Sequence, residues 1–279
     1  AERDVPAPDV GTTPQTMAWI MDTYSMQVGF HTTGVVTGKP QILGGSLGRR
    51  EATGMGVAFT IANAAKKINL SLENARVAIQ GFGNVGYFVG KNLQNMGARI
   101  VAISNSLGGV HHANGLPLEA LHQHSLKDRD LSNFSDTEKI SNEELLALDC
   151  DILVPAALEN QVTSDNADRV KCKIYAEGAN GPTTLEADRI LEDKGIFMIP
   201  DILANSGGVV VSYFEAVQDR QNLFWEIDEI YKRMENTMHQ AFEEVYATRM
   251  KENVGMRTAA LMLGISRVAE ALRVRGLYP

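Results

Sequence analysis

Apolar residues recur along the chain with two spacings, one typical of helices and one of short buried strands. In "PQTMAWIMDTYS" (14–25) they follow the i, i+3, i+4, i+7 pattern of an amphipathic helix: Met17, Ile20, Met21 and Tyr24. The glycine-rich stretch 35–49 predicts a linker, and helical spacing returns from Glu51 to Ile68. The chain therefore begins with two predicted helices joined by a glycine-rich connection.

Short apolar runs alternate with helical stretches through the middle of the chain. Five of these runs predict buried strands: 76–80, 99–104, 151–156, 173–177 and 197–200. Helices are predicted from Asn84, near 117–124 and over 142–148, whereas roughly the last 70 residues are helical without a strand signal. Strands that alternate with helices form a parallel sheet. The predicted fold class is therefore α/β, with a doubly wound, Rossmann-like sheet.

A glycine motif follows the first of these strands. In "VAIQGFGNVGYFVG" the spacing GxGxxG falls on Gly81, Gly83 and Gly86, between an apolar strand and a helix. Gly81 would permit the tight turn, Gly83 would let the backbone approach a pyrophosphate, and Gly86 would let helix and strand pack closely. This context favours a dinucleotide site over a purely structural turn, with the phosphates at the positive end of the helix dipole.

The second strand would supply the residues that read the adenosine ribose. A carboxylate at its end is typical of NAD sites, but the sequence there offers Ser104 and Asn105. With no carboxylate a 2′-phosphate is not repelled, and no neighbouring arginine attracts one. The cofactor is therefore predicted to be NAD or NADP, with the choice open.

Composition narrows the class of protein. Of 279 residues, 44% are hydrophobic and 22% are charged, which is typical of a globular protein, and the formal net charge of −8 argues against non-specific nucleic-acid binding. No membrane span or signal peptide is expected, so we expect a cytosolic protein. Cys150 and Cys172 are predicted to be buried thiols, and the histidines to be loop or surface residues rather than metal ligands.

Two further stretches suggest chemistry. In "ERDVPAPDVGT", Pro6 and Pro8 restrict the backbone before Asp9, which from the residues alone is either a turn aspartate or a rigidly held functional carboxylate. In "ANSGGVVVSYFEA", two glycines and three valines start a predicted helix poorly. Val209, Ser212 and Ala216 would share one face of that helix, and core packing of that face is the simpler interpretation.

Seven motifs in order carry a resemblance to a known family: "VPAPD", "VVTGKP", "GGSLGRREATG", "QGFGNVG", "VPAALE", "AEGANGPTT" and "IPDILANSGGVVVSYFEAVQ". The chain resembles the glutamate dehydrogenases of the Glu/Leu/Phe/Val dehydrogenase family, along essentially its whole length. The resemblance implies NAD(P)-dependent oxidative deamination of L-glutamate to 2-oxoglutarate and ammonia. A leucine or phenylalanine dehydrogenase and a non-catalytic dinucleotide-binding module are the alternatives.

The resemblance also implies roles for single residues. Asp9 would be the catalytic proton carrier. Thr53 would bind the nicotinamide carboxamide and Asn180 the nicotinamide ribose, whereas Asn84 is expected to cap its helix and reach the cofactor. The full set of expected cofactor-binding residues is Thr53, Gly81, Phe82, Gly83, Asn84, Val85, Gly86, Ser104, Asn105, Ala156 and Asn180. The expected substrate-binding residues are Asn205, Val209 and Ser212.

The chain corresponds to about the last two thirds of such an enzyme. Residues 1–39 would be a remnant of the substrate domain, 40–253 the dinucleotide-binding domain, and 254–279 a helix that returns toward the remnant. The family's catalytic lysine lies in an amino-terminal glycine-rich segment, and "ILGGSLGRR" contains no lysine. We therefore expect this chain alone to bind cofactor but to turn over glutamate negligibly. The intact enzyme is expected to be a homohexamer.

Overall fold

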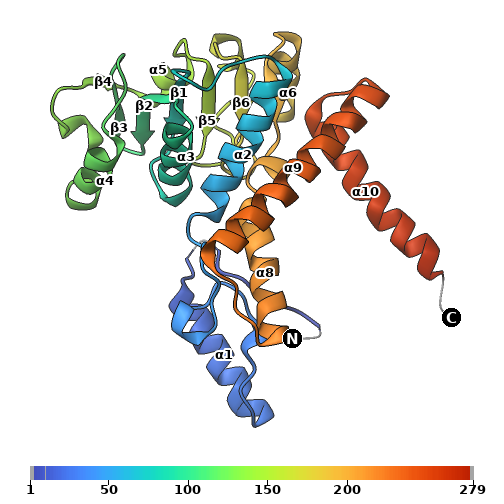
Figure 1. The fold of residues 1–279 in the computed structure, drawn as a ribbon. Helices are drawn as coiled ribbons and strands as arrows, with labels where there is room; N and C mark the ends of the chain where they lie inside the picture. Colours follow the sequence, from blue (N-terminus) through green and yellow to red (C-terminus); the bar gives the residue numbers. More distant parts are fainter. Residues whose placement is uncertain (1–2, 10, 277–279) are drawn as a thin grey trace. The chain divides into compact units, whose positions relative to one another are not determined.

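The computed structural model describes residues 3–9 and 11–276 (Figure 1). Residues 1, 2 and 10 of the predicted segment 1–39, and residues 277–279 of the predicted carboxyl-terminal helix, lie outside this description. The helices are α1 (Pro14–Val28), α2 (Ala52–Lys67), α3 (Asn84–Asn95), α4 (Leu118–Lys127), α5 (Asn142–Leu146), α6 (Leu185–Asp193), α7 (Asp201–Ala204), α8 (Gly207–Gln221), α9 (Ile227–Glu252) and α10 (Met256–Arg275). The strands are β1 (Arg76–Gln80), β2 (Arg99–Asn105), β3 (Gly108–His111), β4 (Glu138–Ile140), β5 (Ile152–Pro155), β6 (Ile174–Ala176) and β7 (Phe197–Ile199).

The chain divides into two compact units, which are described separately. Unit 1 comprises Ala1–Thr53 and Gly207–Thr237, and unit 2 comprises Gly54–Ser206 and Met238–Pro279. The domain boundaries expected from the sequence, at residues 39/40 and 253/254, stay a prediction.

A seven-stranded sheet in the order β4-β3-β2-β1-β5-β6-β7 forms the centre of unit 2 (Figure 1). The five strands predicted from the sequence are all present and all parallel. β1 pairs with β2 on one side and with β5 on the other, so the strand order reverses at β1. Ligands of doubly wound sheets bind at this kind of position, beyond the carboxyl ends of the strands. The predicted fold class is confirmed.

One edge of the sheet differs from the prediction. β3 and β4 were not expected, and both pair antiparallel, so the sheet is mixed rather than wholly parallel. Asn105 pairs with Gly108, which leaves a two-residue hairpin connection between β2 and β3. β3 and β4 each contain one strongly apolar residue, Val110 and Ile140, so no apolar run marks them in the sequence, and pairing with the neighbouring strand stabilises them instead.

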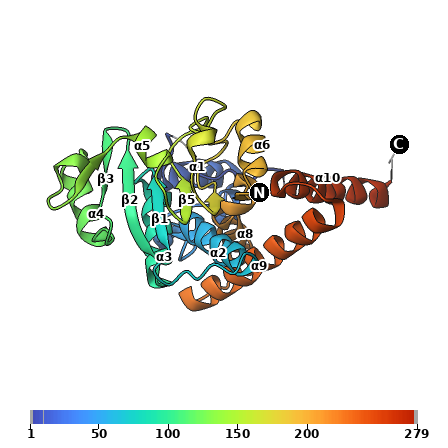
Figure 2. The ribbon, with the colours of Figure 1, turned by 90° about the horizontal axis from the view of Figure 1, so that it is seen from above.

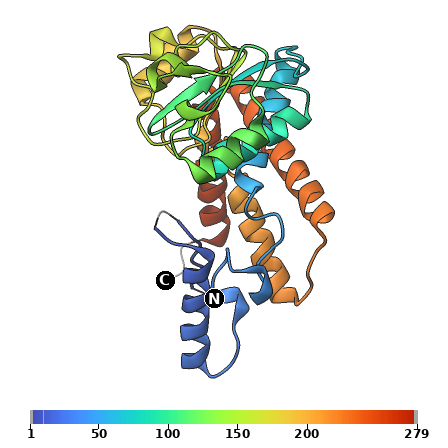
Figure 3. The same ribbon diagram turned by 90° about the vertical axis from the view of Figure 1, so that its left-hand side faces the viewer.

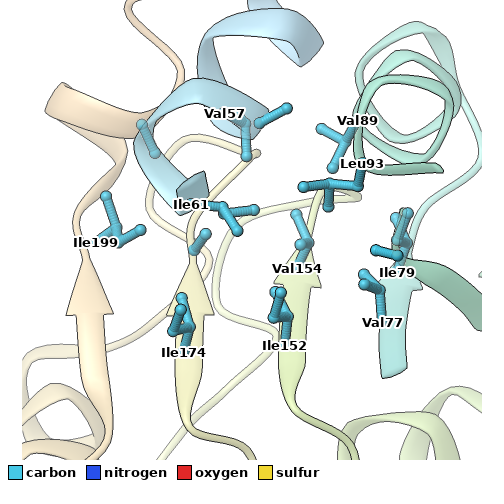
Figure 4. Packing of buried hydrophobic residues seen from close by; sticks show 14 of the residues in the cluster. Val57, Ile61, Val77, Ile79, Val89, Leu93, Ile152, Val154, Ile174 and Ile199 are labelled. Atoms are coloured by element: carbon cyan, nitrogen blue, oxygen red, sulfur yellow. The ribbon is translucent and has the colours of Figure 1, made fainter. Parts of the chain in front are cut away.

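Apolar side chains on both faces of the sheet explain why helices cover both (Figure 2). On one face, strand residues pack against α2 and α3, and Figure 4 shows this layer: Val57, Ile61, Val77, Ile79, Val89, Leu93, Ile152, Val154, Ile174 and Ile199. The alternate strand residues, such as Ala78, Leu153 and Tyr175, pack with Leu145 of α5 and Leu191 of α6. Because successive strand side chains point to opposite faces, each strand is apolar throughout.

Helix α1 in unit 1 confirms the first predicted helix and extends it to Val28. Thr13 caps it with a capping box, Pro14 occupies the first turn, and Gly29 ends it in the left-handed conformation at φ 80°. These are the residue types that start and stop helices. The second predicted helix, 51–68, is α2.

The glycine-rich segment 35–49 is folded rather than a linker. It contains buried residues, among them Val36, Lys39 and Ser46, and it runs beside α8 within unit 1 (Figure 3). The Glu215 side chain of α8 accepts hydrogen bonds from the backbone N–H groups of Gly38 (3.1 Å) and Ser46 (3.2 Å). A carboxylate far away in the sequence thus orders the segment, which explains why local composition was misleading.

The remaining expectations concern thiols, histidines and membranes. Cys150 is buried, Cys172 is partly exposed, and both are free; burial raises the pKa of the Cys150 thiol to about 12. His122 lies in α4 rather than in a loop, and its ring stacks on Tyr87 with centroids 3.9 Å apart. In the part of the chain described, no helix is long and apolar enough to span a membrane.

Candidate cofactor and substrate sites

The glycine motif forms the connection between β1 and α3 in unit 2. Gly81 has φ 100°, a left-handed value, and a Cβ there would lie 2.5 Å from the carbonyl oxygen of Ala156. The Gly81 N–H donates to the carbonyl of Ser104 (2.9 Å), so the turn is anchored to the end of β2. Only glycine fits such a position without strain.

The other two glycines differ in their surroundings. A Cβ on Gly86 would collide with the carbonyl oxygen of Gly81, whereas a Cβ on Gly83 would meet nothing within 4 Å. Gly83 is the N-cap of α3, and Asn84 is the first helical residue, so the prediction that Asn84 caps the helix is wrong. A glycine N-cap has no side chain to engage the first N–H groups of α3, which leaves that end open toward an anion.

Phe82 and Val85, two predicted residues of the motif, make packing contacts. The Phe82 ring makes edge contacts with Tyr87 (centroids 6.2 Å apart) and His122 (5.8 Å). Val85 is half-buried and packs against the apolar core. Both residues hold the turn in place while its backbone stays accessible.

The end of β2 is held by a residue that the sequence did not single out. The Ser104 hydroxyl is buried and donates to Oδ1 of Asn142 (2.8 Å), and Nδ2 of Asn142 donates to the carbonyl of Asn105 (2.8 Å). The Asn105 amide donates to the carbonyl of Arg129 (2.6 Å). The side chains of Ser104, Asn105 and Asn142 are neutral, and protein partners already engage the Ser104 hydroxyl and the Asn105 amide.

The loops that follow β5 and β6 carry two more of the predicted cofactor-binding residues, Ala156 and Asn180. Ala156 donates its N–H to the carbonyl of Gln80 (2.7 Å), which places it beside the glycine turn. Asn180 is exposed, and its Oδ1 accepts a hydrogen bond from Nδ2 of Asn205 (2.7 Å). The structure therefore brings together Asn180, predicted to contact cofactor, and Asn205, predicted to contact substrate.

In unit 1, the segment that carries Asp9 is fixed by its neighbours. Thr37 donates its N–H to the carbonyl of Pro6 (2.9 Å), and Gly38 has φ 76° with its Cα against the Pro8 ring, where a Cβ would collide. The Thr12 hydroxyl engages both the N–H (2.7 Å) and the carbonyl of Asp9. The prolines thus belong to a packed segment that presents Asp9 at the surface.

A buried charge cluster supports this segment. Nζ of Lys39 lies 2.7 Å from Oε1 of Glu215 and 2.7 Å from Oδ2 of Asp219, and all three side chains are fully buried. Burial raises the pKa of Asp219, and Lys39 acts in the opposite direction. Since Glu215 also binds the backbone of Gly38, the cluster connects α8 to the segment that holds Pro8.

The amino-terminal half of α8 is the second polar region of unit 1. Nε of Arg49 donates to the Ser212 hydroxyl (2.9 Å), and a Cβ on Gly208 would lie 2.5 Å from Oγ1 of Thr53. Val209 is 72% exposed, so core packing does not explain its place on this face. Burial lowers the pKa of Arg49, which nearby Glu215 partly offsets.

These groups suit two kinds of chemistry. A helix amino terminus opened by glycine suits a phosphate, and a guanidinium beside a hydroxyl suits a carboxylate. Arg49 was not predicted; the available signal was the arginine pair Arg49–Arg50 that follows a glycine-rich segment directly before a helix. Among the described residues no group of three or more His, Cys, Asp or Glu is arranged to hold a metal ion.

Comparison with known proteins decides the family. A profile described as "Glutamate/Leucine/Phenylalanine/Valine dehydrogenase" matches residues 44–276, and one described as "Glu/Leu/Phe/Val dehydrogenase, dimerisation domain" matches 1–26. The chain belongs to the Glu/Leu/Phe/Val dehydrogenase family. This membership was predicted from the motifs and is confirmed.

Individual members of the Glu/Leu/Phe/Val dehydrogenase family are close in sequence and structure. A glutamate dehydrogenase of Thermotoga maritima is 51% identical over 277 residues, 99% of this chain and 67% of that protein. An NAD-specific glutamate dehydrogenase of Staphylococcus aureus is 48% identical over 98% of this chain and 66% of that protein. The hetero-hexameric glutamate dehydrogenase of Thermus thermophilus, in a Leu-bound form, superposes with a TM-score of 0.94 at 38% identity over 99% of this chain and 65% of that one. The chain thus spans about two thirds of the length of its relatives.

Proposed function

We propose that the chain is the cofactor-binding part of an NAD(P)-dependent glutamate dehydrogenase, which deaminates L-glutamate oxidatively to 2-oxoglutarate and ammonia. The observation that carries the proposal is the turn at Gly81–Gly86, open at the amino terminus of α3 and placed where the strand order reverses. The names of the relatives, among them "NAD-specific glutamate dehydrogenase", support the substrate and cofactor. The hexameric state named for the Thermus thermophilus relative supports a hexamer for the enzyme that contains this chain.

The residues of unit 2 would hold the cofactor from its two ends. Gly81, Gly83 and Gly86, with the first N–H groups of α3, would hold the pyrophosphate. Ser104 and Asn105 would lie at the adenosine ribose, and Asn180 at the nicotinamide ribose. When bound, the nicotinamide ring accepts the hydride that leaves the substrate Cα.

The residues of unit 1 would act on the substrate. Asp9 would accept and release a proton at the substrate nitrogen, since its carboxylate is exposed on a rigid segment. Ser212 and Arg49 would bind the side-chain carboxylate, and Val209 is the other expected substrate contact in unit 1. Asn205, which the resemblance also assigns to substrate, belongs to unit 2. An apolar substrate side chain would leave the Arg49 guanidinium and the Ser212 hydroxyl without a carboxylate partner, so this pair favours glutamate over leucine or phenylalanine.

Titration with reduced cofactors tests the proposal on the chain as it stands. We expect NADH and NADPH to bind with affinities within about a hundredfold of each other, roughly 2.7 kcal/mol, because the side chains of Ser104 and Asn105 at the end of β2 are neutral. Cofactor fluorescence measures both affinities. Gly86→Ala is the control that should abolish binding of both cofactors, since its Cβ would displace the turn. Failure of the chain to bind either cofactor would refute the proposed function, and a larger preference would reveal a charged determinant.

Substitution of Ser212 tests the choice of amino acid. In an active enzyme that contains this chain, Ser212→Val should lower kcat/KM for glutamate by at least about tenfold, because the carboxylate loses a hydroxyl donor. The ratio of kcat/KM for glutamate to kcat/KM for norvaline, its apolar analogue, should fall accordingly. Ser212→Thr keeps the hydroxyl and is the matched control. An unchanged glutamate-to-norvaline ratio would support a leucine-type dehydrogenase instead.

The expectation that the 279-residue chain alone turns over glutamate negligibly stays a prediction. An assay of glutamate-dependent NADH formation by the chain, in the same preparation that binds NADH, measures it.

A further inference from the structure

An ionic cluster in unit 2 lies behind the loop that is proposed to hold the nicotinamide half of the cofactor. Arg257, the second residue of α10, contacts three carboxylates with three different nitrogens. Nη2 lies 2.6 Å from Oε1 of Glu177, Nε lies 3.1 Å from Oδ1 of Asp188, and Nη1 lies 3.2 Å from Oδ1 of Asp201. One side chain thus joins the end of β6, helix α6 and the start of α7 to α10.

Two of the carboxylates that Arg257 binds, those of Glu177 and Asp201, also accept backbone hydrogen bonds that fix the loop 177–181. The second oxygen of Glu177 accepts the N–H of Asp201 (2.7 Å), and the second oxygen of Asp201 accepts the N–H of Gly181 (2.8 Å). Asn180 precedes Gly181, and its side chain is held by Asn205, whose own N–H bonds to the carbonyl of Asp201 (3.0 Å). Asp201 therefore holds the N–H that follows Asn180 and the residue that binds the Asn180 side chain, whereas the N–H groups of Gly178 and Ala179 bond to the carbonyl of Pro155 (2.9 and 3.0 Å).

The negative charges of the three carboxylates make this arrangement depend on the Arg257 guanidinium. Glu177 is fully buried, whereas Asp188 and Asp201 are nearly buried, and Arg257 is the cation that contacts all three. Burial raises the pKa of Glu177, and Arg257 opposes this shift. Without Arg257, the carboxylates of Glu177 and Asp201 would repel each other, and relieving the repulsion would move the loop that carries Asn180.

We propose that Arg257 is a positioning residue for cofactor binding, which sets the loop 177–181 so that Asn180 can hold the nicotinamide half of the dinucleotide. The inference rests on the proposed role of Asn180. Arg257 itself touches no cofactor, because its nitrogens face the three carboxylates. Its action is therefore confined to the nicotinamide half, and the adenosine half is held at the glycine turn and the end of β2.

Comparison of NADH with ADP, which lacks both the nicotinamide ring and its ribose, tests this separation in the 279-residue chain. NADH affinity is measured by cofactor fluorescence and ADP affinity by competition. The unmodified chain should bind NADH more tightly than ADP. Arg257→Gln should lower NADH affinity by about tenfold or more and leave ADP affinity within about twofold. Arg257→Lys keeps the positive charge but not the planar guanidinium, so its NADH affinity should lie between those of the unmodified chain and of Arg257→Gln.

Two further variants keep the test decisive. Arg267→Gln, on an exposed part of the same helix, should change neither affinity. Asp201→Asn keeps the volume but weakens the link to Gly181, so it should reproduce the loss for NADH even where Arg257→Gln fails to fold. Equal losses for NADH and ADP, an unchanged NADH affinity, or equal affinities for NADH and ADP in the unmodified chain would overturn the inference. The absence of binding of either ligand to the unmodified chain would instead refute the proposed function on which it rests.

Discussion

Asp9→Asn is expected to lower kcat by about 10²–10⁴ in an active enzyme that contains this chain, the usual contribution of a positioned acid–base group. Asparagine keeps the shape of the side chain, and the backbone bonds of Thr12 to residue 9 do not involve the carboxylate. The proposed proton transfer is lost because an amide does not titrate. NADH affinity should stay within about threefold, since the glycine turn at Gly81–Gly86 is not altered.

Asp22→Asn, an exposed carboxylate on α1, is the matched control and should leave kcat unchanged. Measuring kcat, NADH affinity and melting temperature on one preparation separates catalysis from folding. A structural aspartate would lower the melting temperature and weaken every ligand with a near-normal kcat in the folded fraction. A kcat within about fivefold of the parent enzyme would remove Asp9 from the mechanism.

Lys39→Met should destabilise unit 1 by about 3–5 kcal/mol, the cost of leaving a buried charge without its partner. The substitution leaves Glu215 and Asp219 fully buried and without the ammonium that lies 2.7 Å from each. Both tryptophans, Trp19 and Trp225, belong to unit 1, so urea unfolding followed by tryptophan fluorescence reports this unit.

Three comparisons check the physical cause. Lys232→Met, at an exposed lysine of unit 1, should change stability by no more than about 0.5 kcal/mol. Adding Asp219→Asn to Lys39→Met should recover part of the loss, because the amide carries no charge. The loss should also shrink as the pH falls from about 8 to about 5, since a carboxyl with a raised pKa in the folded state destabilises folding only when it is ionised. A loss below about 1 kcal/mol at neutral pH would contradict the role given to Lys39.

Local patterns accounted for the elements that are long or strongly apolar. The spacing of Met17, Ile20, Met21 and Tyr24 predicts α1, and the helix forms there with Thr13 and Gly29 at its ends. Met17 and Met21 are buried, whereas Ile20 and Tyr24 are exposed. The five parallel strands were found because both faces of the sheet are covered, so each strand is a continuous apolar run. β3 and β4 are neither long nor strongly apolar, and no local pattern marks them.

The candidate site divides in the same way. The glycine turn could be predicted because its requirements are local: a left-handed residue at Gly81 and no side chain at Gly86. Asn142 could not be predicted, because its two partners, Ser104 and Asn105, lie 38 and 37 positions away in the sequence. The same holds for Arg49, whose partner Ser212 lies 163 positions away.

The motifs of the sequence by themselves therefore indicated the family. Local patterns also determined the order of the five parallel strands and the position of the dinucleotide turn, because backbone preferences and apolar periodicity act over a few residues. The tertiary structure alone decided that 35–49 is folded, that Lys39 is buried between Glu215 and Asp219, and that Arg257 joins three carboxylates. A buried charge is tolerated only beside its partner, and which residues become partners is set by the packing of distant segments.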